Sequence, residues 1–314
     1  MGLVVTVTPN ASLDHTLYVD ELRPGRRHRV RSEHAQAGGK GVNVARVLAA
    51  LGVAVRSVVI LGGETGHAIH RDLERARLAP VVIPAPGESR TCIEILEDQP
   101  GRTTQVHGAG VRATDETARA LVAAVEASLA GAGWLALCGS LPAGLPEDTY
   151  ARLVHVAQAR GVHVALDASA APLLAGWRAG PDLLRINREE AARALDASDP
   201  AALVLPPARA PGATRLAVVS DGGEPAVAWS AAGQRWQITP PRVRTRNPIG
   251  CGDAMLAGLI ATLDAGSVDD ALRFATALAA ADAESHLAGR PDAERARELA
   301  REVSVEVTLR EHPA

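Results

Sequence analysis

The sequence predicts a doubly wound α/β fold, in which a mostly parallel sheet carries helices on both faces. Short runs of β-branched residues alternate with alanine-rich segments of helical periodicity, which is typical of parallel strands joined by crossover helices. The 314 residues are 47% hydrophobic and 22% charged, with a net charge of −3, so the chain can bury a large core. We therefore expect one domain over residues 1–314.

The expected strands are short apolar runs: Leu3–Thr8, Ser57–Leu61, Trp134–Cys138, Val162–Asp167, Leu183–Ile186 and Leu216–Ser220. Helix signals lie between them: Asn43–Leu51 before Gly52, a helix from Thr114 with acidic residues in its first turn, and Pro146–Arg160 before Gly161. The low-complexity stretch Pro206–Pro211 predicts a surface loop.

Two stretches, residues 12–35 and 89–108, break this alternation of strands and helices. Both show the apolar and polar alternation of antiparallel strands around turns, as in Leu17–Val19 and Thr91–Leu96. We expect them to form a small β lid inserted into the main domain. Exposed lid strands have unpaired edges, so a homodimer that pairs two lids is a candidate assembly.

Composition argues against several classes of partner. Aromatic residues make up 2% of the chain and are not interleaved with basic residues, so no nucleic-acid partner is expected. No apolar run reaches the roughly 18 residues that span a bilayer, and no basic leader precedes Leu3, so we expect no membrane partner and a cytoplasmic location. Cys92, Cys138 and Cys251 lack CxxC spacing, which suggests neither a disulfide framework nor a zinc site.

Lys40 is the only lysine among 33 cationic side chains, and it lies in the run Ala37-Gly38-Gly39-Lys40-Gly41. An ammonium is a compact point charge that fits among close-packed backbone, whereas a guanidinium is a wide planar fork. The flanking glycines can adopt positive φ and let a polar ligand lie against backbone N–H groups. The run is interpreted as a ligand-binding turn, with a tight turn and a solvated lysine as the alternative.

A second motif, Ile249-Gly250-Cys251-Gly252-Asp253, precedes apolar residues at helical spacing, so a glycine turn opens a buried helix. Free N–H groups at such a helix start stabilise negative charge. A carboxylate at Asp253 can accept the proton of an alcohol that attacks a phosphoryl group. The alternative is an aspartate that only caps the helix.

These motifs occur together with others in the order typical of one enzyme family: Thr8–Asp14, Ala37–Ala45, Gly139–Pro142, Asn187–Glu190 and Asn247–Asp253. On them the chain resembles the PfkB (ribokinase-like) carbohydrate kinases over nearly its whole length. Asn10–Asp14 and Gly87–Thr91 are most similar to the phosphohexose kinase branch, which includes 1-phosphofructokinase and tagatose-6-phosphate kinase. The resemblance implies a ribokinase-like fold.

The resemblance also implies an activity. It is Mg-ATP-dependent transfer of the γ-phosphoryl group to the free primary hydroxyl of a ketohexose monophosphate, with fructose 1-phosphate as the first candidate. Tagatose 6-phosphate and fructose 6-phosphate are alternative substrates. A non-catalytic sugar-phosphate sensor is an alternative from another class, which the intact glycine turn and Asp253 disfavour. A dehydrogenase is disfavoured because the chain has neither a dinucleotide fingerprint after its first strand nor a Walker loop.

Roles for individual residues follow from the same resemblance. Asp253 is the expected base, and the backbone of Gly250, Cys251 and Gly252 is the expected anion hole. The sugar phosphate is expected to contact Asp14, Gly38, Gly39, Lys40, Asn43, Arg90 and Ser140, with Arg27 and Arg29 of the lid as further phosphate ligands. ATP is expected to contact Asn187, Ser220, Gly222 and Gly223, and Glu190 is expected to bind Mg²⁺ through water.

Three departures from the family pattern stand out. Arg185-Ile186 replaces the usual Lys-Pro before Asn187, Pro225 replaces a glycine of the nucleotide loop, and Asn247-Pro248 replaces the common Asp-Thr. Proline fixes φ and removes an N–H, so Pro225 puts the geometry of that loop in question. Asn247 weakens the case for a monovalent cation site.

Overall fold

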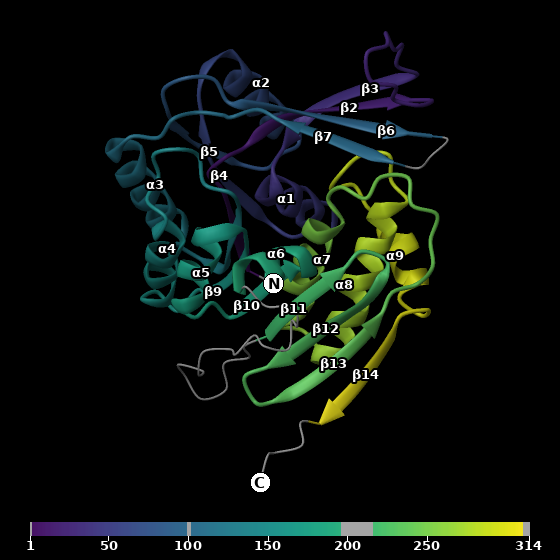
Figure 1. The fold of residues 1–314 in the computed structure, drawn as a ribbon. Coiled ribbons are helices and arrows are strands. Elements are labelled where there is room, and N and C mark those ends of the chain that lie inside the picture. Colours follow the sequence, from purple (N-terminus) through teal and green to yellow (C-terminus); the bar gives the residue numbers. More distant parts are fainter. Residues whose placement is uncertain (1, 99–101, 196–215, 310–314) are drawn as a thin grey trace.

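The computed structural model describes residues 2–98, 102–195 and 216–309 (Figure 1). In them a 10-stranded sheet has the order β14-β13-β12-β11-β10-β9-β8-β1-β4-β5. Neighbouring strands from β11 to β5 are parallel, and β12, β13 and β14 add antiparallel pairs at one end. The strands are β1 (Leu3–Thr8), β4 (Val55–Leu61), β5 (Pro80–Pro84), β8 (Ala132–Gly139), β9 (His163–Ala168), β10 (Leu183–Asn187), β11 (Leu216–Asp221), β12 (Glu224–Ser230), β13 (Gln234–Thr239) and β14 (Ser304–Leu309).

Helices cover both faces of this sheet. The core on one face includes side chains of α1 (Lys40–Ala50), α2 (Gly63–Arg75), α7 (Cys251–Thr262), α8 (Val268–Ala283) and α9 (Ala293–Leu299). The core on the other face includes side chains of α3 (Asp115–Ser128), α4 (Thr149–Gln158), α5 (Ala170–Arg178) and α6 (Arg188–Leu195). The predicted fold class is confirmed.

The central strands are apolar on both sides because each side faces a helical layer. In β4, Val59 and Leu61 belong to one core, and Val58 and Ile60 belong to the other. Such strands read as continuous apolar runs in sequence, which is why they could be predicted. All six predicted strands form, with ends that differ from the predicted ends by at most two residues.

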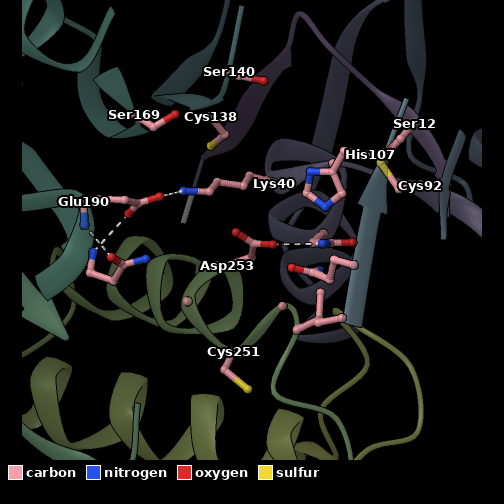
Figure 2. A pocket seen from close by; sticks show the side chains of 18 of the residues that line it. Ser12, Lys40, Cys92, His107, Cys138, Ser140, Ser169, Glu190, Cys251 and Asp253 are labelled. Atoms are coloured by element: carbon pink, nitrogen blue, oxygen red, sulfur yellow. Dashed lines mark hydrogen bonds and ion pairs between the residues drawn. The ribbon is translucent and has the colours of Figure 1, made fainter. Parts of the chain in front are cut away.

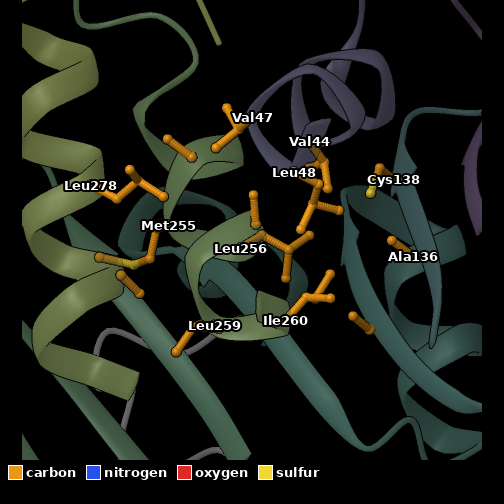
Figure 3. Packing of buried hydrophobic residues seen from close by; sticks show 14 of the residues in the cluster. Val44, Val47, Leu48, Ala136, Cys138, Met255, Leu256, Leu259, Ile260 and Leu278 are labelled. Carbon is orange, nitrogen blue, oxygen red and sulfur yellow. The ribbon is translucent and has the colours of Figure 1, made fainter. Parts of the chain in front are cut away.

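Helix α7 is buried nearly all round, and Figure 3 shows its side chains packed between α1, α8 and β8. A Cβ at Gly258 would lie 2.8 Å from the Cα of Ala275, so this glycine permits close packing of α7 against α8. The other predicted helices form as well, although α1 begins at Lys40 rather than Asn43 and α4 begins at Thr149 rather than Pro146. The Pro206–Pro211 prediction lies outside the described residues.

A second sheet of four strands lies beside the main one (Figure 1), in the order β3-β2-β6-β7. It is built from β2 (Ser12–Val19), β3 (Ser32–Gly38), β6 (Arg90–Glu97) and β7 (Thr103–His107). Antiparallel pairs β2–β3 and β6–β7 are joined by a parallel β2–β6 pair. Residues 28–31, part of the stretch 12–35 that was predicted to form antiparallel strands, lie before β3 and belong to no strand. The amide of Gln36 donates to the carbonyl oxygen of Ala288 at 3.0 Å and ties this small sheet to the main body.

The carboxyl end of β1 lies at a switch in the chain path. β1 pairs in parallel with both β4 and β8, and the chain leaves its end at Thr8 to build the first hairpin of the small sheet. Ligands of open α/β sheets bind at such points, outside the carboxyl ends of the strands. Among the helices of the described residues, none is long and apolar enough to cross a membrane.

Candidate active site

A cleft of about 980 Å³ lies where the carboxyl ends of the central strands meet the small sheet and the N-termini of α1 and α7. Most of the residues predicted to bind or react line it: Asp14, Gly39, Lys40, Asn43, Arg90, Ser140, Asn187, Glu190, Ser220, Gly222, Gly250, Cys251, Gly252 and Asp253. These residues come from distant parts of the chain, so the fold brings the predicted motifs together.

Four of the predicted residues do not line the cleft. Arg27 and Arg29 are exposed, in the segment between β2 and β3. Gly223 lies in the β11–β12 turn, and Gly38 is next to the carboxylate of Asp14, which itself lines the cleft. The geometry therefore does not support direct contact between these four residues and a ligand bound in the cleft of the same molecule.

Each of the three glycines around Lys40 is required for a different structural reason. A Cβ at Gly38 would lie 1.7 Å from Oδ2 of Asp14, so a side chain there would displace the carboxylate. Gly39 caps α1 with a φ of 99°, in the region that favours glycine. A Cβ at Gly41 would lie 2.3 Å from Oγ1 of Thr8, so a side chain at this position would prevent α1 from beginning this close to β1.

Lys40 makes two ion pairs across the cleft. Its Nζ donates to Oδ1 of Asp167 at 2.5 Å and to Oε1 of Glu190 at 2.8 Å (Figure 2 shows the Glu190 pair). Burial alone would lower the pKa of Lys40, but the two carboxylates outweigh burial and raise it. Lys40 is therefore a fixed positive charge within the cleft, and the interpretation as a solvated lysine is wrong.

Asp167 was expected only as the end of a strand, yet it is the buried centre of this charge network. It is fully buried, and its second oxygen accepts from Nη1 of Arg185 at 3.0 Å. Burial raises the pKa of Asp167, but Lys40 and Arg185 outweigh burial and hold it below its ordinary value. Arg185, which had no assignment from sequence, also donates to Oγ of Ser220 at 2.5 Å.

The glycine turn before α7 brings the N-terminus of this helix close to the Asp167 and Arg185 charges. Gly250 caps the helix with a φ of 91°, and a Cβ there would lie 2.9 Å from Oδ2 of Asp282. A Cβ at Gly252 would lie 2.1 Å from Nη1 of Arg185, so the guanidinium occupies the space that a side chain would need. In Figure 2 the sulfur of Cys251 points away from Lys40, so only the Cys251 backbone belongs to this turn.

Asp253 follows the turn and faces the cleft, 6% exposed. Its Oδ2 accepts from Nδ2 of Asn43 at 2.8 Å, the dashed contact beside Asp253 in Figure 2. Burial, followed by the charge of Asp167, raises the pKa of Asp253 to about 7, while Lys40 opposes the rise. A carboxyl with this pKa can exchange a proton near neutral pH. Its contacts do not match a helix cap: among the described residues, the hydrogen bond to its carboxylate comes from the side chain of Asn43 and not from a backbone N–H of the turn.

The loop before this turn is fixed by Asn247. Its Oδ1 accepts from the backbone N–H of Ile249 at 2.9 Å, and its Nδ2 donates to the carbonyl oxygen of His286 at 3.3 Å. The first contact is a local side-chain turn of the kind that asparagine often forms. The departure at Asn247-Pro248 therefore supports a defined loop, and Pro248 lines the cleft.

Asn187 and Glu190 form a reciprocal cap at the start of α6. The N–H of Glu190 donates to Oδ1 of Asn187 at 2.7 Å, and the N–H of Asn187 donates to Oε2 of Glu190 at 3.1 Å. This is a capping box, which explains the spacing of the pair without a ligand. Glu190 nevertheless keeps its other oxygen on Lys40, inside the cleft.

On the small-sheet side, polar groups surround a space beside Lys40. Oγ of Ser12 donates to Oδ1 of Asp14 at 2.5 Å, and burial raises the pKa of Asp14. Nε of Arg90 donates to the carbonyl oxygen of Asn10 at 3.0 Å. In the described part of the chain, the terminal nitrogens of Arg90 make no hydrogen bond, so the guanidinium fork is available to an anion.

The predicted nucleotide loop is a tight hairpin between β11 and β12. Gly222 has a φ of 59°, and the strand register shifts between Val219 and Asp221. Pro225 lies beside this irregularity, where a strand tolerates the loss of an N–H. The sequence missed the cleft residues Gln105 and His107 of β7, because the alternation of β7 alone does not reveal which face meets the cleft.

Comparisons with known proteins agree with this geometry. Residues 5–295 match the model of the pfkB family of carbohydrate kinases. A 1-phosphofructokinase of Xanthomonas campestris is 35% identical over 312 residues, covering 96% of this chain and 97% of the relative. A 1-phosphofructokinase of Rhodobacter capsulatus is 34% identical, with coverages of 96% and 97%.

Solved structures share the fold. A possible 1-phosphofructokinase of Thermotoga maritima superposes with a TM-score of 0.84 at 23% identity, covering 98% of this chain and 99% of that one. The tetrameric inhibited form of phosphofructokinase-2 from Escherichia coli gives a TM-score of 0.81 at 23% identity, with coverages of 96% and 99%. With the family model matched over nearly the whole chain, the protein belongs to the pfkB family of carbohydrate kinases.

Proposed function

We propose that this protein is an ATP-dependent 1-phosphofructokinase, which transfers the γ-phosphoryl group to the free primary hydroxyl of fructose 1-phosphate. The observation that carries the proposal is Asp253, a buried carboxyl with a pKa of about 7 that directly follows a glycine turn at a helix start. The relatives named 1-phosphofructokinase support the choice of substrate.

Asp253 acts as the general base in this proposal. Near neutral pH its ionised form accepts the proton of the sugar hydroxyl as that oxygen attacks the γ-phosphorus. The N–H groups of Gly250, Cys251 and Gly252 face negative charge that develops on the transferred group, and the α7 dipole adds to their effect. Asn43 holds one oxygen of Asp253, which leaves the other for the hydroxyl.

The sugar phosphate is proposed to lie between the small sheet and α1. Asp14 and the backbone around Gly39 would hydrogen-bond its hydroxyls, while Ser140 stands opposite them. Arg90 would bind the phosphate already on the sugar through its free fork. Lys40, which the carboxylates of Asp167 and Glu190 now hold, would neutralise charge between the two substrates.

Asn187, Ser220 and Gly222 line the far side of the cleft, where the proposal places ATP. Among the described residues no group of three or more His, Cys, Asp or Glu side chains could hold a metal ion by itself. Mg²⁺ prefers oxygen ligands and keeps several waters, so the Glu190 carboxylate and Asn187 amide fit an ion that arrives on ATP and is contacted through water. When bound, it would neutralise phosphate charge.

The small sheet is proposed to act as a lid, since it forms one wall of the cleft and would exclude water on closure. A homodimer that pairs two lids remains part of the proposal because β3 and β7 are edge strands. In such a dimer the exposed Arg27 and Arg29 could reach the site of the other copy.

A coupled ADP-release assay tests the proposal. It compares fructose 1-phosphate, fructose 6-phosphate and tagatose 6-phosphate with unphosphorylated fructose, tagatose and ribose. We expect the highest kcat/KM with fructose 1-phosphate. A higher kcat/KM with another sugar phosphate would reassign the substrate, and ADP formation with none of them would favour a sensor.

A further inference from the structure

Arg46 is a buried cation in α1, three residues after Asn43 and therefore on the same side of the helix. It is 6% exposed. Its Nη2 donates to the carbonyl oxygen of Ala37 at 2.8 Å, and its Nη1 donates to Oδ1 of Asn43 at 3.3 Å. Asp72 lies 3.5 Å away as its ion-pair partner. The Nε of Arg46 has no hydrogen-bond partner in the described chain.

A buried charge with one unsatisfied donor is costly to the folded state. Burial lowers the pKa of Arg46 to about 10, which is a sign of that cost. An apolar side chain on this face of α1 would avoid it. The position of Arg46 therefore calls for an explanation outside stability.

The amide of Asn43 supplies that explanation. On one side it meets Asp253, whose carboxylate only accepts hydrogen bonds when ionised, and on the other side it meets Arg46, which only donates. One amide orientation satisfies both neighbours, with Nδ2 on Asp253 and Oδ1 on Arg46. Without Arg46, nothing would hold the amide oxygen in place, and a flipped amide would turn that oxygen toward Asp253, where it could accept a hydrogen bond only from the protonated carboxyl.

We propose that Arg46 is a positioning residue for phosphoryl transfer: it holds the oxygen of the Asn43 amide, so that the amide NH₂ stays on Asp253 and stabilises the ionised carboxylate. The inference rests on the proposed function, in which Asp253 is the base. Arg46 does not line the cleft. It acts through Asn43 alone.

Replacing Arg46 leaves the other charged groups around Asp253 and around position 46 in the chain. Asp253 is faced by Asp167 of β9, Lys40 of α1 and Arg185 of β10, and by the thiols of Cys138 and Cys251. Arg46 is faced by Asp72 of α2, Asp14 of β2, Asp282 of α8 and the nearby Arg290. A change in the titration of Asp253 on replacing Arg46 therefore reports the amide contact, provided that the replacement keeps the charge.

Arg46→Lys meets that condition, because it keeps the charge but cannot bridge Ala37 and Asn43 with a planar fork. The pKa of Asp253 can be followed by carboxyl ¹³C NMR of aspartate-labelled protein, with the resonance assigned from its loss in Asp253→Asn. We expect a rise of about one pKa unit in Arg46→Lys, since a hydrogen bond to a charged group is lost. Asn43→Ala should raise the pKa similarly. Arg46→Lys should add nothing further in the Asn43→Ala background.

Kinetics provide the second readout. A pKa rise of about one unit lowers kcat by about tenfold at pH 6 and has little effect at pH 9, where the carboxyl is ionised in both proteins. The KM for ATP should not change. A merely structural role would instead lower kcat by the same factor at every pH.

Several results would overturn the inference. These are an unchanged pKa of Asp253 in Arg46→Lys, a further rise in the Asn43→Ala background, or a pKa shift with no pH-dependent loss of kcat. Because the NMR titration needs no turnover, it reports the relay even if the sugar substrate has been assigned wrongly. Conversely, an Asp253→Asn enzyme with wild-type kcat would refute the base, and with it the role of Arg46 in transfer.

Discussion

Asp253 and Asp167 are both buried and interact through their charges, yet their environments shift their pKa values in opposite directions. Asp167 touches two cations and is held ionised, whereas the hydrogen bond of Asp253 within the described residues comes from the neutral amide of Asn43, and its pKa is raised to about 7. A pair of carboxyl groups separated in this way commonly divides into a structural charge and an acid–base catalyst. In the proposed mechanism Asp253 is the group that moves a proton.

Replacing Asp253 by asparagine should remove most of the turnover and leave substrate binding largely intact. The amide keeps the size of the side chain but cannot accept the hydroxyl proton, so kcat should fall by about 10²- to 10⁴-fold. The wild-type kcat should fall as pH drops through about 7, because the base is then protonated. Steady-state kinetics and calorimetric binding of both substrates provide the measurement, and a variant that keeps more than about a third of kcat would contradict the base.

Lys40→Arg tests the need for a compact cation. The variant keeps the charge, but its planar fork cannot take the place of an ammonium that lies 2.5 Å from Asp167 and 2.8 Å from Glu190. We expect kcat/KM for the sugar phosphate to fall by at least about tenfold, with little change in Tm. Near-normal kinetics would show that the charge alone suffices.

Among the helices, α7 begins at a turn in which Gly252 is needed because there is no space for a side chain. A Cβ there would lie 2.1 Å from the buried guanidinium of Arg185, whereas a Cβ at Gly223 would meet nothing within 4 Å. Gly252→Ala should therefore lower the free energy of unfolding by about 1–3 kcal/mol and abolish most activity. Gly223→Ala should leave the free energy of unfolding within about 0.5 kcal/mol of wild type, as denaturant titration can check.

Strand β6 carries two glutamates whose pKa values move in opposite directions. Burial, together with Asp14, raises the pKa of Glu94 to about 7, whereas the hydrogen bond from Arg102 lowers the pKa of Glu97. Between about pH 4.5 and 7 the folded protein binds the Glu94 proton more tightly than the unfolded chain does. Glu94 therefore makes stability fall as pH rises through this range.

Glu94→Gln should flatten that fall. Glu97→Gln is the matched control, because it removes a contribution that is present above about pH 4.5 and lost at lower pH. Urea titrations at pH 5 and pH 7.5 measure both. If Glu94→Gln loses as much stability between these pH values as wild type does, Glu94 is ionised in the folded protein.

At the scale of the whole molecule, the sequence was most informative about the central sheet. Its parallel strands are apolar on both faces, so their runs of valine and leucine identify them. β5 was not predicted, because it is an edge strand that begins and ends with proline. The bounds of β3 were also missed, since its first residues are polar and exposed.

The candidate site could be predicted where glycine spacing carries the signal, as around Lys40 and Asp253. Asp167 and Arg185 could not, because the partners that define their roles are far away in sequence: Lys40 contacts Asp167 across 127 positions. Burial of a charge at the end of an apolar strand was the one available sign. Asn187 and Glu190, in contrast, have the spacing of a capping box in the sequence itself, and their backbone contacts show that they form one.

The proposed placement of two substrates in one cleft makes Arg90 the determinant of preference for phosphorylated sugars. Arg90→Ala removes the fork that would bind the sugar phosphate and spares Asp253. We expect kcat/KM for fructose 1-phosphate to fall by about tenfold to a hundredfold, since a charge-assisted contact is lost, while kcat/KM for fructose changes little. An equal loss with both sugars would mean that Arg90 serves packing rather than phosphate binding.

The proposed activation of the free primary hydroxyl of fructose 1-phosphate by Asp253 can be followed directly by ³¹P NMR of the reaction with Mg-ATP. Wild-type protein should convert ATP to ADP while a second phosphomonoester signal grows on the sugar, and Asp253→Asn should slow both changes by about 10²-fold or more. Absence of the second sugar phosphate with wild-type protein, or its formation at the wild-type rate by Asp253→Asn, would contradict this role of Asp253.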